Sequence, residues 1–184
     1  EKHDLILVSD EIHCDLIFNK SSKHIMSANL NSELANRTIT LMSPSKTYNI
    51  PGLSCAFAII ENHKIRQIYK NSIRGIINEI NCFGYVACEA AYKYGEDWRV
   101  ELLDYLQKNY ILVKSFFETN IPQINLNHMD ATYLAWLRID SLGLETPIQF
   151  FEENGVGLSD GKFFGDSNYI RLNFGCPKDR LFKG

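Results

Sequence analysis

One lysine in this sequence, Lys46, has neighbours that suit covalent chemistry. It lies in the stretch Ser43-Pro44-Ser45-Lys46-Thr47 and follows the β-like run Thr38–Met42, so we expect it where a strand ends and a loop begins. A lysine withdrawn from water loses its charge more readily, which leaves a neutral amine able to attack an aldehyde. Ser43 and Ser45 would offer hydroxyl groups to a phosphate. The alternative is a solvated surface lysine in a polar loop.

A carboxylate, Asp10, follows a second strand-like run. Leu5-Ile6-Leu7-Val8 is short and continuously apolar, which is typical of a strand buried on both faces of a parallel sheet. The segment Ser9-Asp10-Glu11-Ile12-His13 comes next, so we expect Asp10 near the carboxyl end of that strand, where ligands bind in open α/β sheets. The alternative is an aspartate that caps a turn or a helix N-terminus.

Together these two features predict a site for pyridoxal 5′-phosphate (PLP). This cofactor carries an aldehyde that a lysine amine captures and a phosphate that hydroxyl groups bind. Its pyridine nitrogen needs a carboxylate partner, which keeps the ring protonated and able to accept electrons. An acid at one strand end and Ser-x-Ser-Lys at the next would supply all three groups.

The chain resembles fold-type I PLP enzymes of the class I/II aminotransferase superfamily, and within it the cystathionine β-lyase, or C–S lyase, branch of the MalY/PatB type. The resemblance covers nearly all of the chain and rests on five segments: Ser9–His13, Ser43–Leu53, Gly95–Trp98, Ala131–Trp136 and Tyr169–Pro177. It implies that Lys46 forms the Schiff base with the cofactor and that Asp10 pairs with its pyridine nitrogen. It also implies that Ser43 and Ser45 hold the phosphate and that Arg171 binds the substrate α-carboxylate.

Two positions depart from the aminotransferase pattern. Many aminotransferases carry a tyrosine three residues after the aspartate, where it contacts the cofactor's phenolic oxygen, and this chain has His13 there. Many also carry an arginine eight residues after the lysine, which neutralises the phosphate, and this chain has Ser54. Both differences resemble the C–S lyase branch, so they favour β-elimination and make His13 a candidate cofactor-binding residue. The alternative for His13 is a histidine packed at a strand end.

The segment Tyr169–Phe174 alternates in polarity and carries the candidate substrate-binding residue. Ile170, Leu172 and Phe174 share one face of the predicted strand, and Arg171 lies on the opposite face. The planar guanidinium of an arginine matches a carboxylate in bidentate geometry. The alternative is a surface arginine of an edge strand.

Composition excludes several classes of protein. The chain has 184 residues, 45% of them hydrophobic, and a net charge of −3, and no basic block predicts nucleic-acid binding. No apolar run approaches the roughly 20 residues of a membrane span, so we expect no membrane association. An odd number of cysteines without Cys-x-x-Cys spacing favours neither a metal site nor a disulfide framework, and it fits a reducing cytoplasm; they are Cys14, Cys55, Cys82, Cys88 and Cys176.

The predicted fold class is α/β: the second half of a PLP-dependent transferase-like large domain, with a mostly parallel sheet and helices, followed by a small α+β C-terminal domain. We assign residues 1–96 to the large domain and residues 97–184 to a bridging helix and the small domain. Strands are expected at residues 5–8, 38–42, 55–60, 132–137 and 169–174. Helices are expected at residues 63–77, 83–94, 98–120 and 145–154.

The resemblance also predicts the organisation and activity of the protein. The glycine-rich loop, the ring-stacking aromatic and the Asn-Pro-x-Gly motif that the family places before the Asp10 strand are not in this sequence. We therefore expect the C-terminal part of a larger, homodimeric enzyme, inactive as an isolated piece. The predicted reaction is cleavage of cystathionine or a related cysteine S-conjugate to thiol, pyruvate and ammonia. The alternatives are an aminotransferase that uses a 2-keto acid, and a non-catalytic or truncated PLP-fold protein.

Overall fold

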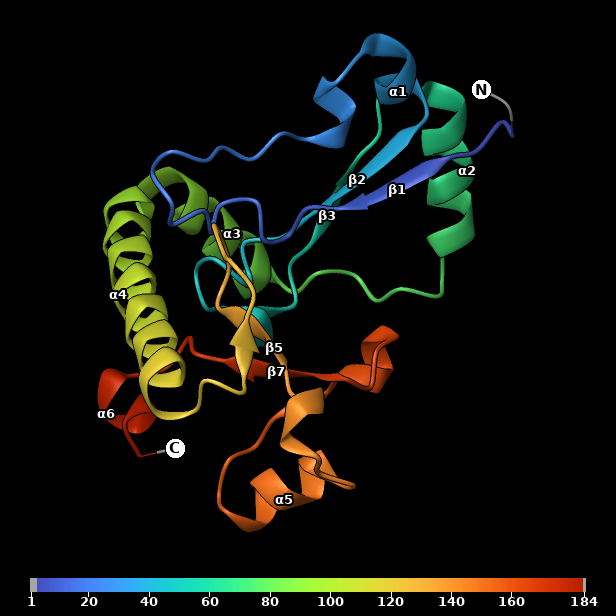
Figure 1. Cartoon of the computed structure of the whole chain (residues 1–184). Coiled ribbons are helices and arrows are strands. Elements are labelled where there is room, and N and C mark those ends of the chain that lie inside the picture. Colours follow the sequence, from blue (N-terminus) through green and yellow to red (C-terminus); the bar gives the residue numbers. More distant parts are fainter. Residues whose placement is uncertain (1–2, 184) are drawn as a thin grey trace. The chain divides into compact units, whose positions relative to one another are not determined.

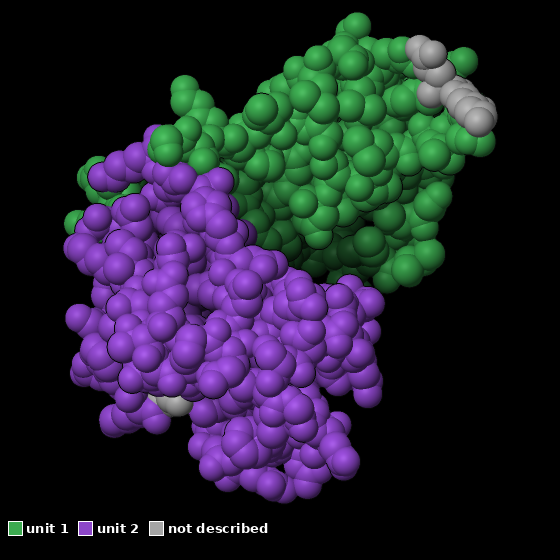
Figure 2. All heavy atoms as spheres, in the orientation of Figure 1, with its two compact units in different colours: residues 1–17, 21–101 green, residues 18–20, 102–184 purple. Residues whose placement is uncertain are grey.

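The computed structural model describes residues 3–183, and these form two compact units, coloured separately in Figure 2. Unit 1 comprises residues up to 17 and residues 21–101, and unit 2 comprises residues 18–20 and those from 102 onwards. The division falls inside the long helix α4 (Glu96–Asn120). The domain boundary predicted at residues 96–97 stays a prediction. No helix in the described part of the chain is long and apolar enough to cross a membrane.

Unit 1 is built on a three-stranded sheet in the order β1-β2-β3, comprising β1 (Leu7–Asp10), β2 (Thr38–Met42) and β3 (Phe57–Ile59) (Figure 1). Strands β1 and β2 are parallel, with Asp10 opposite Leu41, and β3 is antiparallel to β2. The backbone N–H of Glu11 donates to the Leu41 carbonyl (3.0 Å) and extends the pairing one residue beyond β1. The carboxyl ends of β1 and β2 therefore lie at the same edge of the sheet.

The helices of unit 1 begin at asparagines that cap them. Asn31 caps α1 (Ser32–Asn36), Asn62 caps α2 (His63–Ile73) and Asn81 caps α3 (Cys82–Tyr94), each by accepting backbone N–H donors of the first turn. Helix α2 ends at Ile73 and not at residue 77 as predicted, because Arg74 has an extended backbone and Gly75 takes a φ of +74°. A short 3₁₀ turn, η1 (Ser27–Asn29), and α1 connect β1 to β2.

The burial predicted for the first strand is wrong. Leu5, Ile6 and Val8 are 68%, 54% and 57% exposed in this chain. Strand β1 is the edge of a three-stranded sheet, so it has a hydrogen-bonded neighbour on one side only. A continuous apolar run indicates a strand that can be buried on both faces, but whether it is buried depends on the layers packed against it.

Unit 2 contains a four-stranded antiparallel sheet in the order β4-β5-β7-β6. Its strands are β4 (Asn125–Leu126), β5 (Leu134–Arg138), β6 (Ser159–Asp160) and β7 (Tyr169–Asn173), and Figure 1 shows β5 and β7 side by side. Two short helices complete it, α5 (Pro147–Glu153) and α6 (Lys178–Leu181). The alternation predicted for β7 is confirmed, since Ile170 and Phe174 are 1% and 0% exposed.

Candidate active site

The loop that carries Lys46 leaves the carboxyl end of β2 and closes on itself. Two backbone hydrogen bonds shape it, from the Tyr48 N–H to the Pro44 carbonyl (2.9 Å) and from the Ile50 N–H to the Ser45 carbonyl (3.2 Å). Asn49 adopts the left-handed region with a φ of +54°, which an asparagine tolerates better than most residues. Lys46 itself is exposed, so the withdrawal from water that we expected from the sequence is not found in this chain, and its side chain is accessible on a locally fixed turn.

The two serines of this loop are not equivalent. Ser43 is buried at 7% exposure, and its hydroxyl lies 2.8 Å from both the Cys55 carbonyl oxygen and the Ser45 hydroxyl. A carbonyl only accepts, so when Ser43 donates its single proton to Cys55, the Ser45 hydroxyl donates to Ser43 across their 2.8 Å contact. Ser45 is half-buried. Ser45 is thus the more accessible of the two hydroxyl groups, and Ser43 ties the loop to the chain before β3.

Asp10 and the Lys46 loop lie at the same edge of the sheet of unit 1. Asp10 is the last residue of β1, and Ser43 directly follows the last residue of its parallel neighbour β2. The Asp10 carboxylate is exposed, and within residues 3–183 its side chain accepts only a long hydrogen bond (3.4 Å), from the Ile12 N–H. The structure therefore brings together a carboxylate, an amine and hydroxyl groups where the sequence predicted them.

An aromatic cluster packs against the loop that carries Lys46. The Tyr48 ring contacts Tyr92 edge to face (centroids 5.8 Å apart) and Trp98 at a tilt (6.0 Å). Gly95 makes room for it, because a Cβ atom at that position would lie 2.6 Å from Cε1 of Tyr48. Burial raises the pKa of the Tyr48 phenol, so the ring is neutral at physiological pH. The segment Gly95–Trp98, which the sequence singled out without a role, thus supports the loop that carries Lys46.

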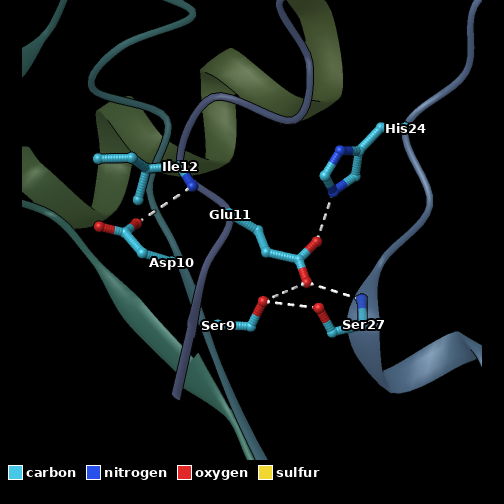
Figure 3. A network of polar contacts seen from close by, with 6 residues as sticks. All are labelled: Ser9, Asp10, Glu11, Ile12, His24 and Ser27. Carbon is cyan, nitrogen blue, oxygen red and sulfur yellow. Dashed lines mark hydrogen bonds and ion pairs between the residues drawn. The ribbon is translucent and has the colours of Figure 1, made fainter. Parts of the chain in front are cut away.

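A buried glutamate, Glu11, lies next to Asp10 and was not predicted (Figure 3). Its side chain is 3% exposed and accepts hydrogen bonds from the Ser9 hydroxyl (2.9 Å) and the Ser27 N–H (3.0 Å). The imidazole Nε2 of His24 lies 2.5 Å from its other carboxylate oxygen. Burial acts to raise the pKa of Glu11, but the hydrogen bonds from His24, Ser27 and Ser9 outweigh it, so the pKa lies below its ordinary value.

His13 lies in the turn that follows β1, where the Leu16 N–H donates to its carbonyl (3.0 Å). It is half-buried and three residues beyond Asp10, as the sequence indicated. The adjacent thiol of Cys14 is also half-buried, and burial raises its pKa to about 11. Cys14 is therefore a neutral thiol near neutral pH and is a poor candidate for a nucleophile.

The predicted substrate-binding residue, Arg171, lies in β7 of unit 2. It is half-buried, and its guanidinium carbon stands 4.4 Å from the ring centroid of Phe164, in the 3₁₀ helix η4 (Gly161–Phe164). Its Nη2 donates to the Ser159 hydroxyl (3.3 Å). Within residues 3–183 no carboxylate lies within 4.0 Å of this guanidinium. The Phe164 ring and the Ser159 hydroxyl orient the guanidinium group of Arg171. Its remaining N–H donors are available to bind a carboxylate ligand.

The residues of unit 1 fit PLP by their chemistry. The exposed amine of Lys46 matches the cofactor aldehyde, the exposed carboxylate of Asp10 matches the pyridine nitrogen, and the hydroxyl of Ser45 matches the phosphate. A further hydroxyl, that of Thr47, is fully buried and has no hydrogen-bond partner among the described residues.

This chain is similar in sequence and in structure to several known proteins. The sequence matches the family "Aminotransferase class I and II" over residues 1–182. Cystathionine β-lyase PatB of Bacillus subtilis (strain 168) is 35% identical over all of this chain, which covers 49% of PatB. The crystal structure of OvoB superposes with a TM-score of 0.95 at 38% identity, over 99% of this chain and 48% of that one. Cystalysin from Treponema denticola, whose structure contains a PLP cofactor, superposes with a TM-score of 0.91 at 33% identity, over 98% and 47%.

The chain belongs to the class I and II aminotransferase family, and the predicted fold class and family are confirmed. It spans about half the length of the curated relatives it matches. The roles of Asp10, His13, Ser43, Ser45 and Lys46, and that of Arg171, stay predictions. The contact between Glu11 and His24 had no local sequence signal, because the two residues are 13 positions apart and meet only through the fold. The contact between the Phe164 ring and the Arg171 guanidinium was likewise not predicted. Phe164 lies close to Arg171 in the sequence, in the segment before the predicted strand, but no periodicity indicated that the two side chains meet.

Proposed function

We propose that the full-length protein is a PLP-dependent carbon–sulfur β-lyase. Its substrate would be cystathionine or a related cysteine S-conjugate, and its products a thiol, pyruvate and ammonia. The observation that carries the proposal is that Asp10 and the Ser43–Lys46 loop lie at the carboxyl ends of two neighbouring parallel strands. Similarity to a relative named cystathionine β-lyase supports the choice of reaction.

PLP is the cofactor that this donor set and the family indicate. When bound, it supplies an aldehyde for the amino group and a ring that stabilises negative charge at the substrate Cα. Asp10 would hold the protonated pyridine nitrogen by a charge-assisted hydrogen bond. Ser45, with Ser43 behind it, would bind the phosphate. His13 would lie beside the ring, at the position where many aminotransferases have tyrosine.

Two residues would act on the substrate. Arg171 would bind the α-carboxylate through its free N–H donors and so fix the orientation of the Cα–H bond. The Nζ amine of Lys46 would remove the Cα proton as a general base. The electron pair left at Cα would form a Cα=Cβ bond as the Cβ–S bond breaks and the thiolate leaves. Water would then hydrolyse the released enamine, after its tautomerisation to the imine, to pyruvate and ammonia.

Cystathionine cleavage tests the proposal directly. We expect the full-length protein, incubated with cystathionine and no added 2-keto acid, to release pyruvate and free thiol at equal rates. The Lys46→Ala variant should release neither, because it lacks the base. Comparison of cystathionine with cysteine and other S-conjugates then ranks the substrates.

An aminotransferase is the second candidate, because it would use the same cofactor-binding residues and the family contains such enzymes. His13 and Ser54 favour the lyase over it, since many aminotransferases have tyrosine and arginine there. Amino transfer that depends on an added 2-keto acid, with negligible thiol release, would favour this second candidate. A protein that binds PLP and catalyses neither reaction would be a non-catalytic member of the family.

We also propose that the full-length protein is a cytoplasmic homodimer that binds neither nucleic acid nor membrane. Sedimentation or light scattering of the full-length protein measures its mass, and twice the monomer mass is the expected result.

A further inference from the structure

The residues on either side of Asp10 are fixed by one polar network, defined here as Ser9, Glu11, His24 and Ser27 (Figure 3). Side chains alternate along an extended chain, so Ser9 and Glu11 share one face while Asp10 points to the other. Figure 3 shows this arrangement, with the Asp10 carboxylate on the side of the chain away from that of Glu11. The two flanking side chains converge on the same partners in the segment from His24 to Ser27.

The network is well satisfied. The Ser27 hydroxyl lies 2.9 Å from that of Ser9, and since Ser9 donates its proton to Glu11, Ser27 donates to Ser9. The Ser27 N–H donates to the same glutamate oxygen that Ser9 reaches. His24 contacts the second oxygen and is 34% exposed, so it links a buried carboxylate to solvent. Such a fully bonded buried network restricts the backbone that carries it.

The backbone of Glu11 is held as firmly as its side chain. Its N–H donates to the Leu41 carbonyl of β2 (3.0 Å), and its carbonyl accepts from the Cys14 N–H (3.0 Å). Asp10 by contrast has one long side-chain hydrogen bond, to the Ile12 N–H (3.4 Å). The Asp10 side chain is thus loosely held by its own contacts among the described residues, whereas the residue that follows it is held at both backbone and side chain.

We propose that Glu11, held by His24 and Ser27, is a positioning residue that aims the Asp10 carboxylate at the pyridine nitrogen of PLP. The inference rests on the proposed function, in which Asp10 pairs with that nitrogen. Removing the charge of Glu11 weakens its hydrogen bonds to the segment from His24 to Ser27, because a neutral oxygen is a weaker acceptor than a carboxylate. The peptide on the carboxyl side of Asp10 then gains freedom, and the carboxylate no longer meets the ring nitrogen in one geometry.

A double-mutant cycle on the full-length protein tests this. The variants are Glu11→Gln, Asp10→Asn and the combination, and the readout is the dissociation constant of PLP, from titration of the apoprotein followed by visible absorbance. Glu11→Gln alone should weaken PLP binding about tenfold, and in the Asp10→Asn background less than twofold, because the interaction it supports is already lost. Asp104→Asn, which removes a carboxylate from the exposed face of α4, is the matched control and should leave the constant unchanged.

The outcomes separate the two proposals. Equal weakening by Glu11→Gln in both backgrounds would mean general loosening of the fold and overturns the positioning role alone. A wild-type protein that binds no PLP overturns the proposed function and the positioning role together. If Glu11→Gln does not fold, His24→Gln carries the same cycle, since His24 is partly exposed and its loss leaves Glu11 bonded to Ser9 and Ser27. A weakening of about threefold that Asp10→Asn abolishes is then expected, and an additive effect contradicts the proposal.

Discussion

Lys46 differs from an ordinary surface lysine in the geometry of its loop, although it is equally exposed. The loop is closed by backbone hydrogen bonds from Tyr48 and Ile50, and the Tyr48 ring is packed beneath it. A long flexible side chain on a rigid turn loses less entropy when it bonds a cofactor than the same side chain on a mobile loop. The loop after β2 therefore lowers the entropy cost of binding a cofactor through Lys46.

We therefore predict that Lys46 is the residue modified by PLP. Borohydride reduction of the full-length protein with its cofactor should leave a pyridoxyl group on the peptide that contains Lys46. Peptide mapping by mass spectrometry locates it, and Lys64, an exposed lysine in the first turn of α2, serves as an internal comparison within the same unit. A label found mainly on Lys64 or any other lysine would contradict the assignment.

Arg171 is the residue for which the structure adds most to the sequence. The Phe164 ring and the Ser159 hydroxyl restrain its guanidinium, so the arginine is oriented before any ligand arrives. A preorganised fork binds a carboxylate more tightly than a mobile one, because less side-chain entropy is lost on binding.

Replacing Arg171 by alanine should weaken amino-acid binding by about 2–3 kcal/mol, the size of a lost charge-assisted contact. The absorbance of bound PLP should stay intact, because Arg171 is assigned to the substrate and not to the cofactor. Arg138→Ala is the matched control, since Arg138 lies in the adjacent strand and is exposed beside Asp140. Steady-state kinetics and ligand titration of both variants measure the difference, and unchanged affinity in Arg171→Ala would remove its assigned role.

The lowered pKa of Glu11 predicts how the free energy of unfolding depends on pH. Its pKa in the folded protein lies below its ordinary value near 4.5, so the unfolded chain binds a proton more readily. The stabilisation that it provides is therefore complete above its ordinary pKa, and is lost as the pH falls through the lowered folded value. Wild type and Glu11→Gln should differ most in free energy of unfolding above about pH 5, and the difference should narrow at lower pH. Urea unfolding at a series of pH values measures it. A difference that is constant from pH 7 down to pH 3 would show that Glu11 acts without its charge.

At the scale of helices and strands, the sequence predicted what depends on local pattern. Thr38–Met42 was predicted as a strand with its observed bounds, and the alternation in β7 placed Arg171 opposite Ile170. Strands β4 and β6 were not predicted as elements, because two-residue strands carry no periodicity and are defined only by their partners. The network around Glu11 also had no local signal, since its members come from two segments joined only in the fold.

The junction between α3 and α4 supports the Lys46 loop and can be tested by adding one methyl group. In Gly95→Ala the new Cβ would meet the Ala91 carbonyl oxygen and lie 2.6 Å from Tyr48 Cε1, so the ring or the helix end must shift. We expect a destabilisation of about 1–3 kcal/mol, typical of overpacking at a tight site. Gly52→Ala is the control, because a Cβ there has no atom within 4 Å. Denaturant unfolding of both variants compares them, and equal stability of the two would show that the Tyr48 contact is loose.

At the scale of the whole molecule, unit 1 exposes much of its apolar surface. Leu5 is 68% exposed, Phe83 72% and Val86 66%, and the predicted site residues Asp10 and Lys46 are exposed as well. Exposed apolar patches of this kind mark surfaces that pack against other protein. The same exposure has a consequence for the cofactor, since water competes for the side chains of Asp10 and Lys46.

We predict that residues 1–184 alone bind PLP weakly, and that the full-length protein binds it tightly. An exposed Lys46 amine can capture the aldehyde, but water hydrolyses the product in an open site. Ser45 and Ser43 offer hydroxyl groups to the phosphate without a positive charge, and Ser54 stands where many relatives of the aminotransferase type have an arginine. Titration of both proteins with PLP near neutral pH, followed by visible absorbance, compares them. Stoichiometric binding of micromolar or tighter affinity by residues 1–184 would mean that the four residues at the ends of β1 and β2, Asp10, Ser43, Ser45 and Lys46, suffice to hold the cofactor.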